Sequence, residues 1–241
     1  MAGKRDPNDP RNQLYKFTID VINKTKPNIF VLENVKGILS FKESDGILVM
    51  KKIINNLESI GYYSKYILLD SSKFGIPQKR ERVIFIGSTF DNKDKVDNII
   101  DKLRNINEPI VTVYDAIHDL EDKEELFLEN HIFTKHTPQM IEKIKSTKPG
   151  ESATNNFSDA FRRIHYDKPS PTVKENHGGV HLHPIKNRVL TPRELARLQS
   201  FPDNFKFLGT KSSVLKQIGN AVPPKLSMKI AEIVWNEFYG K

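Results

Sequence analysis

The spacing of apolar residues predicts a helix followed by a strand near the start of the chain. Residues 10–24 carry apolar side chains at helical intervals, and Pro27 follows at a point where a helix has to end. The apolar positions of this helix are Leu14, Phe17, Val21 and Ile22. Residues 29–32 are continuously apolar, which is typical of a strand buried on both faces in a parallel sheet.

The next elements extend this mixed pattern. A second helix is predicted over residues 47–57, because its apolar positions recur at helical spacing and Gly61 follows. Residues 62–69 and 82–86 have the composition of strands, with a Gly-Pro loop between them. Helices interleaved with strands in this order predict an α/β fold.

The pattern weakens from about Thr89 to Asn187, where no apolar period persists for more than about two turns, which predicts a separate, loop-rich module. Regular structure returns at 191–194, where Thr, Pro and Glu have the spacing of a helix capping box. A final helix is predicted from Pro223 to Phe238.

Composition limits the possible functions. The net charge of +8 favours a polyanionic partner such as nucleic acid, although an ordinary solubilising surface explains it equally well. The sequence has no cysteine, which excludes disulfides, thiolate metal sites and a thiolate nucleophile within it. No apolar run approaches the roughly 20 residues of a membrane span, and the first residues lack the apolar core of a secretory signal. We therefore expect no membrane association and a cytoplasmic location.

Glu33 is the first candidate for chemistry. It lies where the buried strand ends, and in open α/β sheets ligands bind at the carboxyl ends of strands. A half-desolvated carboxyl group there is able to hold or share a proton beside a heterocyclic ring nitrogen. The alternative interpretation is a structural carboxylate that caps the following turn.

A polar segment before the strand at 82–86 supplies further candidates. If this segment is extended, Gln78, Arg80 and Arg82 lie on one face, and their guanidinium groups suit a phosphate, a base carbonyl or a carboxylate such as that of Glu33. The alternative is a solvated charge run at the entrance of a strand.

Two weaker signals complete the set. The segment from Gln217 to Pro224 is predicted to be a loop before the final helix, and its Gly219 lets a ligand approach the backbone closely, although a short turn explains it as well. Several histidines, including His177, have no metal-ligand spacing, so no metal site is predicted.

Four blocks in this order resemble the DNA cytosine-5 methyltransferase family. They are Phe30–Gly37, Gln78–Arg82, Arg193–Pro202 and Gly219–Pro223. Residues 2–5 are similar to the end of the family's catalytic loop, and the middle of the chain falls where the family has its variable target recognition region. The family's Gly-rich cofactor turn and its Pro-Cys nucleophile are missing from this sequence.

The resemblance implies a mechanism in which a cysteine attacks C6 of a flipped cytosine and C5 then takes the methyl group of S-adenosylmethionine. It implies that Glu33 holds the ring N3 and exocyclic amine, and that Arg80 and Arg82 reach the base carbonyl and its surroundings. The implied cofactor contacts are Asn220, Ala221 and Val222. The implied DNA contacts are Gln78, Thr172, Lys174, Asn176 and His177.

The expected fold is α/β, a partial doubly wound, Rossmann-like methyltransferase domain with a small, loop- and β-rich target recognition domain. Residues 1–88 are expected to be the C-terminal half of the catalytic domain, and residues 89–190 the recognition domain. Residues 191–214 are expected to be a capped helix and hinge, and residues 215–241 a final helix returning to the catalytic domain.

The leading hypothesis is one subunit of a split methyltransferase of a prokaryotic restriction–modification system, acting on double-stranded DNA in the cytoplasm. A partner subunit is expected to supply the Pro-Cys motif and the Gly-rich loop, so that the chain alone is inactive and exposes an apolar sheet edge. Two alternatives stay open: a catalytically inactive DNA-binding remnant or truncated gene product, and a basic α/β binding module whose resemblance is accidental.

Overall fold

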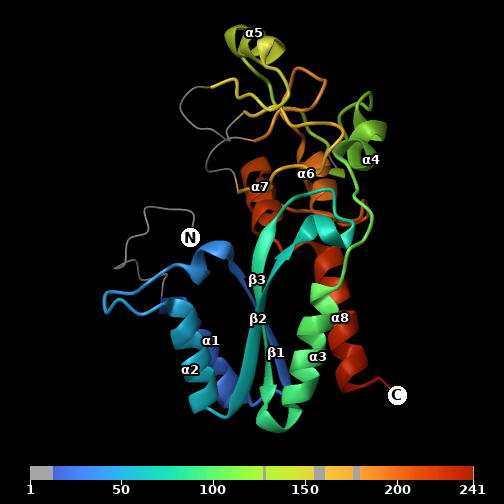
Figure 1. Ribbon diagram of the computed structural model, residues 1–241. Coiled ribbons are helices and arrows are strands. Elements are labelled where there is room, and N and C mark those ends of the chain that lie inside the picture. The colour runs from blue at the N-terminus through green and yellow to red at the C-terminus, as the bar shows by residue number, and fades with distance from the viewer. Residues whose placement is uncertain (1–12, 127–128, 155–160, 176–179, 241) are drawn as a thin grey trace. The chain divides into compact units, whose positions relative to one another are not determined.

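The computed structural model describes residues 13–126, 129–154, 161–175 and 180–240 (Figure 1). The chain divides into two compact units. The first unit holds the residues up to Leu69 together with Glu81–Ile106 and the chain from Ile230 onward, and the second holds Asp70–Arg80 and Asn107–Lys229. Each unit consists of separate stretches of sequence, and the limits of these stretches differ from the predicted boundaries after residues 88 and 190.

The first unit is built on a three-stranded sheet with the order β1-β3-β2. The strands are β1 (Ile29–Val35), β2 (Tyr62–Asp70) and β3 (Glu81–Thr89). β1 and β3 are antiparallel, with Glu33 opposite Ile84 and Val35 opposite Arg82. The prediction of a parallel neighbour for β1 was wrong for this pair, because a continuous apolar run reports burial and carries no information on strand direction.

Helices cover both faces of this sheet. The helices are α1 (Leu14–Thr25), α2 (Val49–Ser59) and α3 (Lys93–Arg104), with short 3-10 turns at Lys36–Leu39 and Phe90–Asn92. Phe30, Val83 and Phe85 pack into one core with α1 and α2, and α3 lies on the other side of the sheet (Figure 1). The mixture of helices and strands confirms the α/β class.

The helix α3 corrects one expectation. The region after Thr89 was predicted to lack any sustained apolar period, yet α3 runs for 12 residues there. Its buried positions are Val96, Ile99, Ile100 and Leu103. These positions have the spacing of one helix face, so the signal was present in the sequence but hidden among charged neighbours.

The helix α1 has two apolar faces. Ile19 and Ile22 are buried against the sheet and α2. Leu14, Phe17 and Val21 were expected on the buried face, but they are 57%, 67% and 57% exposed. Their spacing of three and four residues places them along one side of the helix, so they form a continuous apolar surface, here called the α1 stripe.

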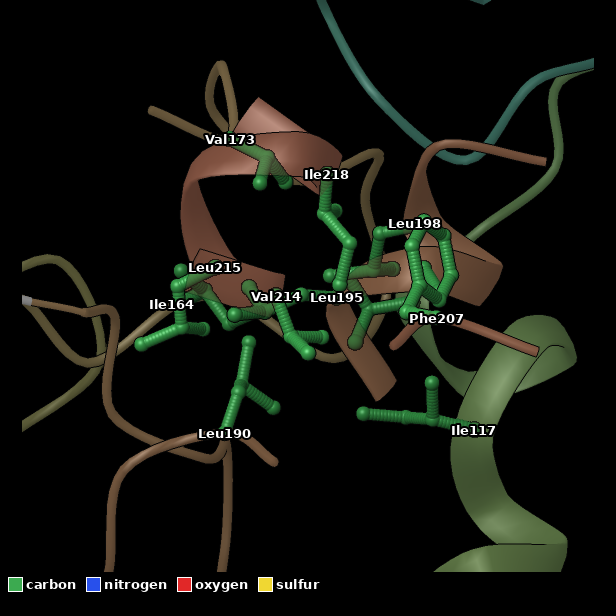
Figure 2. Packing of buried hydrophobic residues seen from close by; sticks show 12 residues of the cluster. Ile117, Ile164, Val173, Leu190, Leu195, Leu198, Phe207, Val214, Leu215 and Ile218 are labelled. Atoms are coloured by element: carbon green, nitrogen blue, oxygen red, sulfur yellow. The ribbon is translucent and has the colours of Figure 1, made fainter. Parts of the chain in front are cut away.

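The second unit contains short helices connected by irregular chain. The helices are α4 (Val113–Ile117), α5 (Pro138–Ser146), α6 (Pro192–Leu198), α7 (Lys211–Asn220) and the first residues of α8 (Pro224–Phe238), with 3-10 turns at Ser71–Phe74 and His118–Leu120. Its core brings apolar side chains of α6 and α7 together with Ile117, Ile164 and Val173 (Figure 2). Within the described residues this unit shows isolated β-bridges rather than the expected β-rich structure.

Buried polar groups organise the irregular chain of this unit. Thr191 and Glu194 form the predicted capping box of α6, which confirms that prediction. Arg163 is buried and donates hydrogen bonds to backbone oxygens of Ile144, Thr147 and His183 at 2.6–2.8 Å. Because buried carbonyl groups need donors, one guanidinium here replaces the ladder that a sheet would provide.

One of the two predictions for the end of the chain is confirmed and the other is wrong. The final helix α8 begins at Pro224 and ends at Phe238, as predicted. Gln217 to Asn220, predicted to be a loop, instead form the last turn of α7. Every helix in the described part of the chain is too short or too polar to cross a membrane.

Candidate active site and nucleic-acid interface

Glu33 and Arg82 are brought together by the sheet of the first unit. Arg82 lies opposite Val35, and Glu33 is two residues before Val35 in β1. Since side chains on one face repeat every second residue, Glu33 and Arg82 are diagonal neighbours on the same face. Nε of Arg82 lies 2.7 Å from Oε1 of Glu33. The register of two strands therefore creates a carboxylate–guanidinium pair.

Each member of this pair keeps one polar atom available. Nη1 of Arg82 donates to the backbone oxygen of Glu81 at 2.8 Å. Oε2 of Glu33 and Nη2 of Arg82 have no hydrogen-bond partner among the described residues. The side chains are 31% and 14% exposed respectively, so solvent or a ligand reaches them. The pair thus presents one acceptor and one donor to a ligand.

The electrostatics of the pair follow from partial burial. Burial lowers the pKa of Arg82, and the attraction of the Glu33 carboxylate opposes that change. A guanidinium group nevertheless stays charged in proteins. A positively charged donor held in a partly dehydrated site stabilises negative charge that develops on a bound ligand more strongly than it would in water.

Gln78 has a different environment from the one predicted. In the second unit, residues 77–79 run beside Ser170, with a bridge between Gln78 and Ser170. Gln78 is fully buried: its Oε1 accepts from the backbone N–H of Val173 at 2.8 Å, and its Nε2 donates to Oε1 of Gln199 at 2.9 Å and to Leu198 O at 3.2 Å. The polar atoms of this side chain are occupied by the protein itself.

Arg80 is also buried, with 2% exposure. Its Nη1 donates to Val173 O at 2.9 Å, and its Nη2 donates to Gly219 O at 3.0 Å and Ala221 O at 3.2 Å. Gln78 and Arg80 therefore converge on Val173, as the predicted alternation brings them to one face, whereas Arg82 pairs with Glu33. A direct contact of Arg80 with a base stays a prediction.

The other predicted DNA contacts lie in residues 170–175 and just after them. Oγ1 of Thr172 donates to Lys79 O at 3.0 Å, which ties this segment to residues 77–80. Lys174 is exposed. Asn176 and His177 lie outside the described residues, as do residues 2–5, which resemble the end of the catalytic loop. Contact of these residues with DNA stays a prediction.

The predicted cofactor contacts lie at the end of α7. Nδ2 of Asn220 donates to Oε2 of Glu175 at 3.0 Å, and Ala221 and Val222 are half-buried. A Cβ atom added at Gly219 would lie 2.2 Å from the backbone nitrogen of Glu175. Gly219 was expected to admit a ligand, but the chain that approaches it most closely is the protein's own segment 174–175.

Sequence reasoning missed one neighbour of Gln78, and it did not indicate that a histidine of the second unit is buried. Gln199 is fully buried and connects Gln78 to Ile218 O, which accepts from Nε2 of Gln199 at 2.7 Å. His183 is fully buried, and burial lowers its pKa to about 4, so it is neutral. In the described ranges, no three His, Asp or Glu side chains gather as they would to hold a metal ion.

Comparisons with known proteins identify the family of this chain. The model of the C-5 cytosine-specific DNA methylase family matches residues 1–235. The type II methyltransferase M1.HphI of Haemophilus parahaemolyticus is 37% identical over 97% of this chain and 64% of its own length. The type II methyltransferase M.DdeI of Desulfomicrobium norvegicum is 30% identical over 98% of this chain and 69% of its own length. The chain thus spans about two thirds of these relatives.

Solved structures show the same likeness. A DNA modification methyltransferase encoded within a prophage of E. coli superposes with a TM-score of 0.71 at 27% identity, covering 96% of this chain and 74% of that chain. The Dnmt2 methyltransferase of S. pombe superposes with a TM-score of 0.63 at 16% identity over 96% of this chain and 74% of that chain, which shows the fold alone. The fold is that of the α/β methyltransferases, and the chain belongs to the C-5 cytosine-specific DNA methylase family.

Proposed function

We propose that this chain is the part of a DNA cytosine-5 methyltransferase that holds the target cytosine while C5 receives a methyl group. The observation that carries the proposal is the Glu33–Arg82 pair, with one acceptor and one donor left open on neighbouring side chains. A cytosine presents an amine donor at C4 and a carbonyl acceptor at C2, which complement an acceptor and a donor set side by side.

The chemistry of this pair suits nucleophilic addition to the base. The Glu33 carboxyl accepts from the exocyclic amine and, when protonated, donates to the ring N3, while Arg82 donates to the base carbonyl. Addition of a thiolate at C6 increases the electron density of the ring. A hydrogen bond at N3 and a cation at the carbonyl oxygen both stabilise that charge, and they act more strongly on the transition state than on the free base.

The cofactor S-adenosylmethionine supplies the electrophilic methyl group. Within this chain, Asn220, Ala221 and Val222 would hold part of it, because Asn220 is exposed and the other two residues are half-buried. The segment is fixed by the contact of Asn220 with Glu175 and by the close packing of Gly219. These residues fit one wall of a cofactor site, whose Gly-rich turn has to come from outside this sequence.

The nucleophile also has to come from outside, since the sequence contains no cysteine. We propose that a partner chain brings the Pro-Cys loop and the Gly-rich turn, and that it docks on the first unit. Among the described residues β1 has a strand on one side only, and Val31 in β1 is 42% exposed. An unpaired strand edge and the exposed α1 stripe are the kinds of surface that another strand and helix cover.

The second unit is proposed to be the target recognition domain that reads double-stranded DNA. A net charge of +8 provides the electrostatic attraction to phosphates, and Thr172 and Lys174 are the described residues proposed to contact the duplex. By analogy with the type II methyltransferases, we propose a role in a prokaryotic restriction–modification system in the cytoplasm.

Methyl transfer tests this function directly. The chain is mixed with a polypeptide that carries a Pro-Cys motif and a Gly-rich turn, and transfer of labelled methyl groups from S-adenosylmethionine to DNA is measured. We expect activity from the mixture and none from either polypeptide alone. DNA binding without any methyl transfer from the mixture would contradict the proposal and favour an inactive DNA-binding remnant.

A further inference from the structure

The backbone N–H and the backbone C=O of Val173 are each held by a buried side chain of one short segment. Its N–H donates to Oε1 of Gln78 at 2.8 Å, and its carbonyl accepts from Nη1 of Arg80 at 2.9 Å. Hydrogen bonds of this kind normally come from the backbone of a neighbouring strand. Here two side chains two residues apart replace that strand, so the position of residues 170–175 depends on them.

The same two side chains reach the end of α7. Nη2 of Arg80 donates to Gly219 O and Ala221 O at 3.0 and 3.2 Å. Gln78 reaches Ile218 O through Gln199, whose Nε2 donates to that oxygen at 2.7 Å. Two independent connections therefore join residues 170–175 to residues 217–222.

Close packing adds a third connection between these segments. A Cβ atom at Gly219 would lie 2.4 Å from the carbonyl carbon of Lys174 and 2.2 Å from the nitrogen of Glu175, so the two backbones touch. Nδ2 of Asn220 donates to the Glu175 carboxylate at 3.0 Å. Separation of the two segments would leave all of these hydrogen-bonding groups exposed or without a partner at once.

We propose that Gln78, Arg80 and Gln199 are positioning residues that make residues 170–175 and 217–222 one mechanical body. A duplex bound at residues 170–175 then also orders the segment that lies against the cofactor. This inference rests on the proposed function for the identity of the two ligands. It gives Gln78 and Arg80 a role inside the protein, where sequence resemblance implied contacts with DNA and with the base.

The energetic reason is the direction of the hydrogen bonds. A glutamine amide has a fixed acceptor and a fixed donor, and the chain from Val173 N–H through Gln78 and Gln199 to Ile218 O uses each in one direction. Breaking one bond leaves a buried donor or acceptor unpaired, which costs more than the bond itself contributes. Partial opening of one segment is therefore less favourable than opening of both together.

Hydrogen–deuterium exchange of the chain tests the mechanical part without any ligand. The variant Gln199→Met removes the connection to Ile218 without burying a charge. Gln217→Met is the matched control: Gln217 precedes Ile218 in the last turn of α7, and its side chain is exposed and donates to Leu208 O and Ser213 Oγ. We expect exchange to become roughly tenfold faster in residues 170–175 as well as 217–222 for Gln199→Met. We expect no change in residues 170–175 for the control.

Faster exchange confined to residues 217–222 in Gln199→Met would overturn the proposal. If that variant does not fold, the wild-type chain gives the same test in low denaturant, where one body requires both segments to open with the same dependence on denaturant. Different dependences would overturn it equally.

A second arm adds a mixed-sequence DNA duplex to the wild-type chain and to Gln199→Met. We expect protection of both segments in the wild type and of residues 170–175 alone in the variant. Protection restricted to residues 170–175 in the wild type would overturn the coupling while supporting DNA contact. Protection of neither segment would contradict the DNA contact assigned under the proposed function. The coupling of the two segments would then be decided by the exchange experiment without ligand.

Discussion

Glu33 and Arg82 contact each other at 2.7 Å because the antiparallel register of β1 and β3 sets them diagonally on one face of the sheet. The two residues are far apart in the sequence, and because both lie on paired strands, their contact does not depend on the conformation of a loop. A pair placed on paired strands is positioned more precisely than one placed on loops. The geometry that we propose for cytosine recognition is therefore built into the sheet.

Replacement of Glu33 by glutamine should abolish proton donation to the base while keeping the shape of the side chain. We expect methyl transfer by the complete enzyme to fall by about 10²–10³-fold, because a glutamine amide still donates a hydrogen bond to N3 but has no proton to transfer to it, with little change in DNA affinity. Glu81→Gln is the matched control, because Glu81 pairs with Lys36 on the surface. Equal rates for Glu33→Gln and Glu81→Gln would contradict the proposed role of Glu33.

The α1 stripe should be needed for assembly. Phe17→Glu places a charge at a side chain that is 67% exposed, so the fold should tolerate it while association with the cysteine-bearing polypeptide is lost. Leu208→Glu, at a residue of the second unit that is 80% exposed, is the control. Both associations are measured by size-exclusion chromatography of the mixture. Association that survives Phe17→Glu as fully as Leu208→Glu would show that the stripe is not the docking surface.

Gly219→Ala should destabilise the second unit. The added methyl group would meet the backbone of residues 174–175 at 2.2–2.7 Å, and backbone cannot rotate away as a side chain does. Overpacking of this kind costs about 1–3 kcal/mol. Asn220→Ala removes only the hydrogen bond to Glu175 and should have a smaller effect on the midpoint of thermal unfolding. A Gly219→Ala protein as stable as the wild type would contradict the close approach.

The free energy of unfolding should begin to decrease at pH values above those at which carboxylates are protonated. Burial lowers the pKa of His183 from 6.5 to about 4, so the unfolded chain binds a proton that the folded chain does not. Stability is therefore lost as the pH falls from 6.5 towards about 4, by at most about 1.4 kcal/mol per pH unit from this residue. Burial raises the pKa of Glu194, but the hydrogen bonds and charge of Arg188, together with His183 and the backbone of Thr191, lower it overall, so its contribution is lost only below its usual value of 4.5.

His183→Asn isolates this contribution. Nδ1 of His183 accepts from the backbone N–H groups of Ile185 and Lys186 at 3.2 and 3.1 Å, and an asparagine oxygen is able to accept in the same place. Urea unfolding across this pH range should show a shallower loss of stability in the variant than in the wild type. An unchanged slope would mean that His183 is not buried in its neutral form. His131 and His136, whose pKa values burial also lowers, account for the slope that remains.

Local patterns predicted what local interactions determine. The Thr191–Glu194 capping box and the final helix to Phe238 depend on neighbours within a few residues, so their sequence signals were sufficient. The strand direction of β1 was predicted wrongly because pairing depends on residues 82–88, which the apolar run does not specify. The helix α3 was missed because its four buried positions stand among Lys and Asp residues that dominate the local composition.

The environments of the candidate site residues required long-range information. Gln78 and Arg80 belong to a block whose resemblance implied DNA and base contacts, yet their side-chain partners are 93 to 141 residues away in the sequence. Nothing in the local alternation distinguishes a guanidinium that faces a ligand from one that binds buried carbonyl groups. Arg82 pairs with Glu33 because the two lie on strands whose register no sequence motif states.

The location of a covalent adduct with DNA is the most direct test of the central claim. The chain and the cysteine-bearing polypeptide are incubated with S-adenosylmethionine and a duplex containing 5-fluorocytosine, where fluorine at C5 prevents release of the nucleophile after methyl transfer. We predict a DNA adduct on the cysteine-bearing polypeptide, formed only in the presence of this chain and lost with its Glu33→Gln variant. An adduct on this chain, or one that forms on the other polypeptide in its absence, would contradict the account.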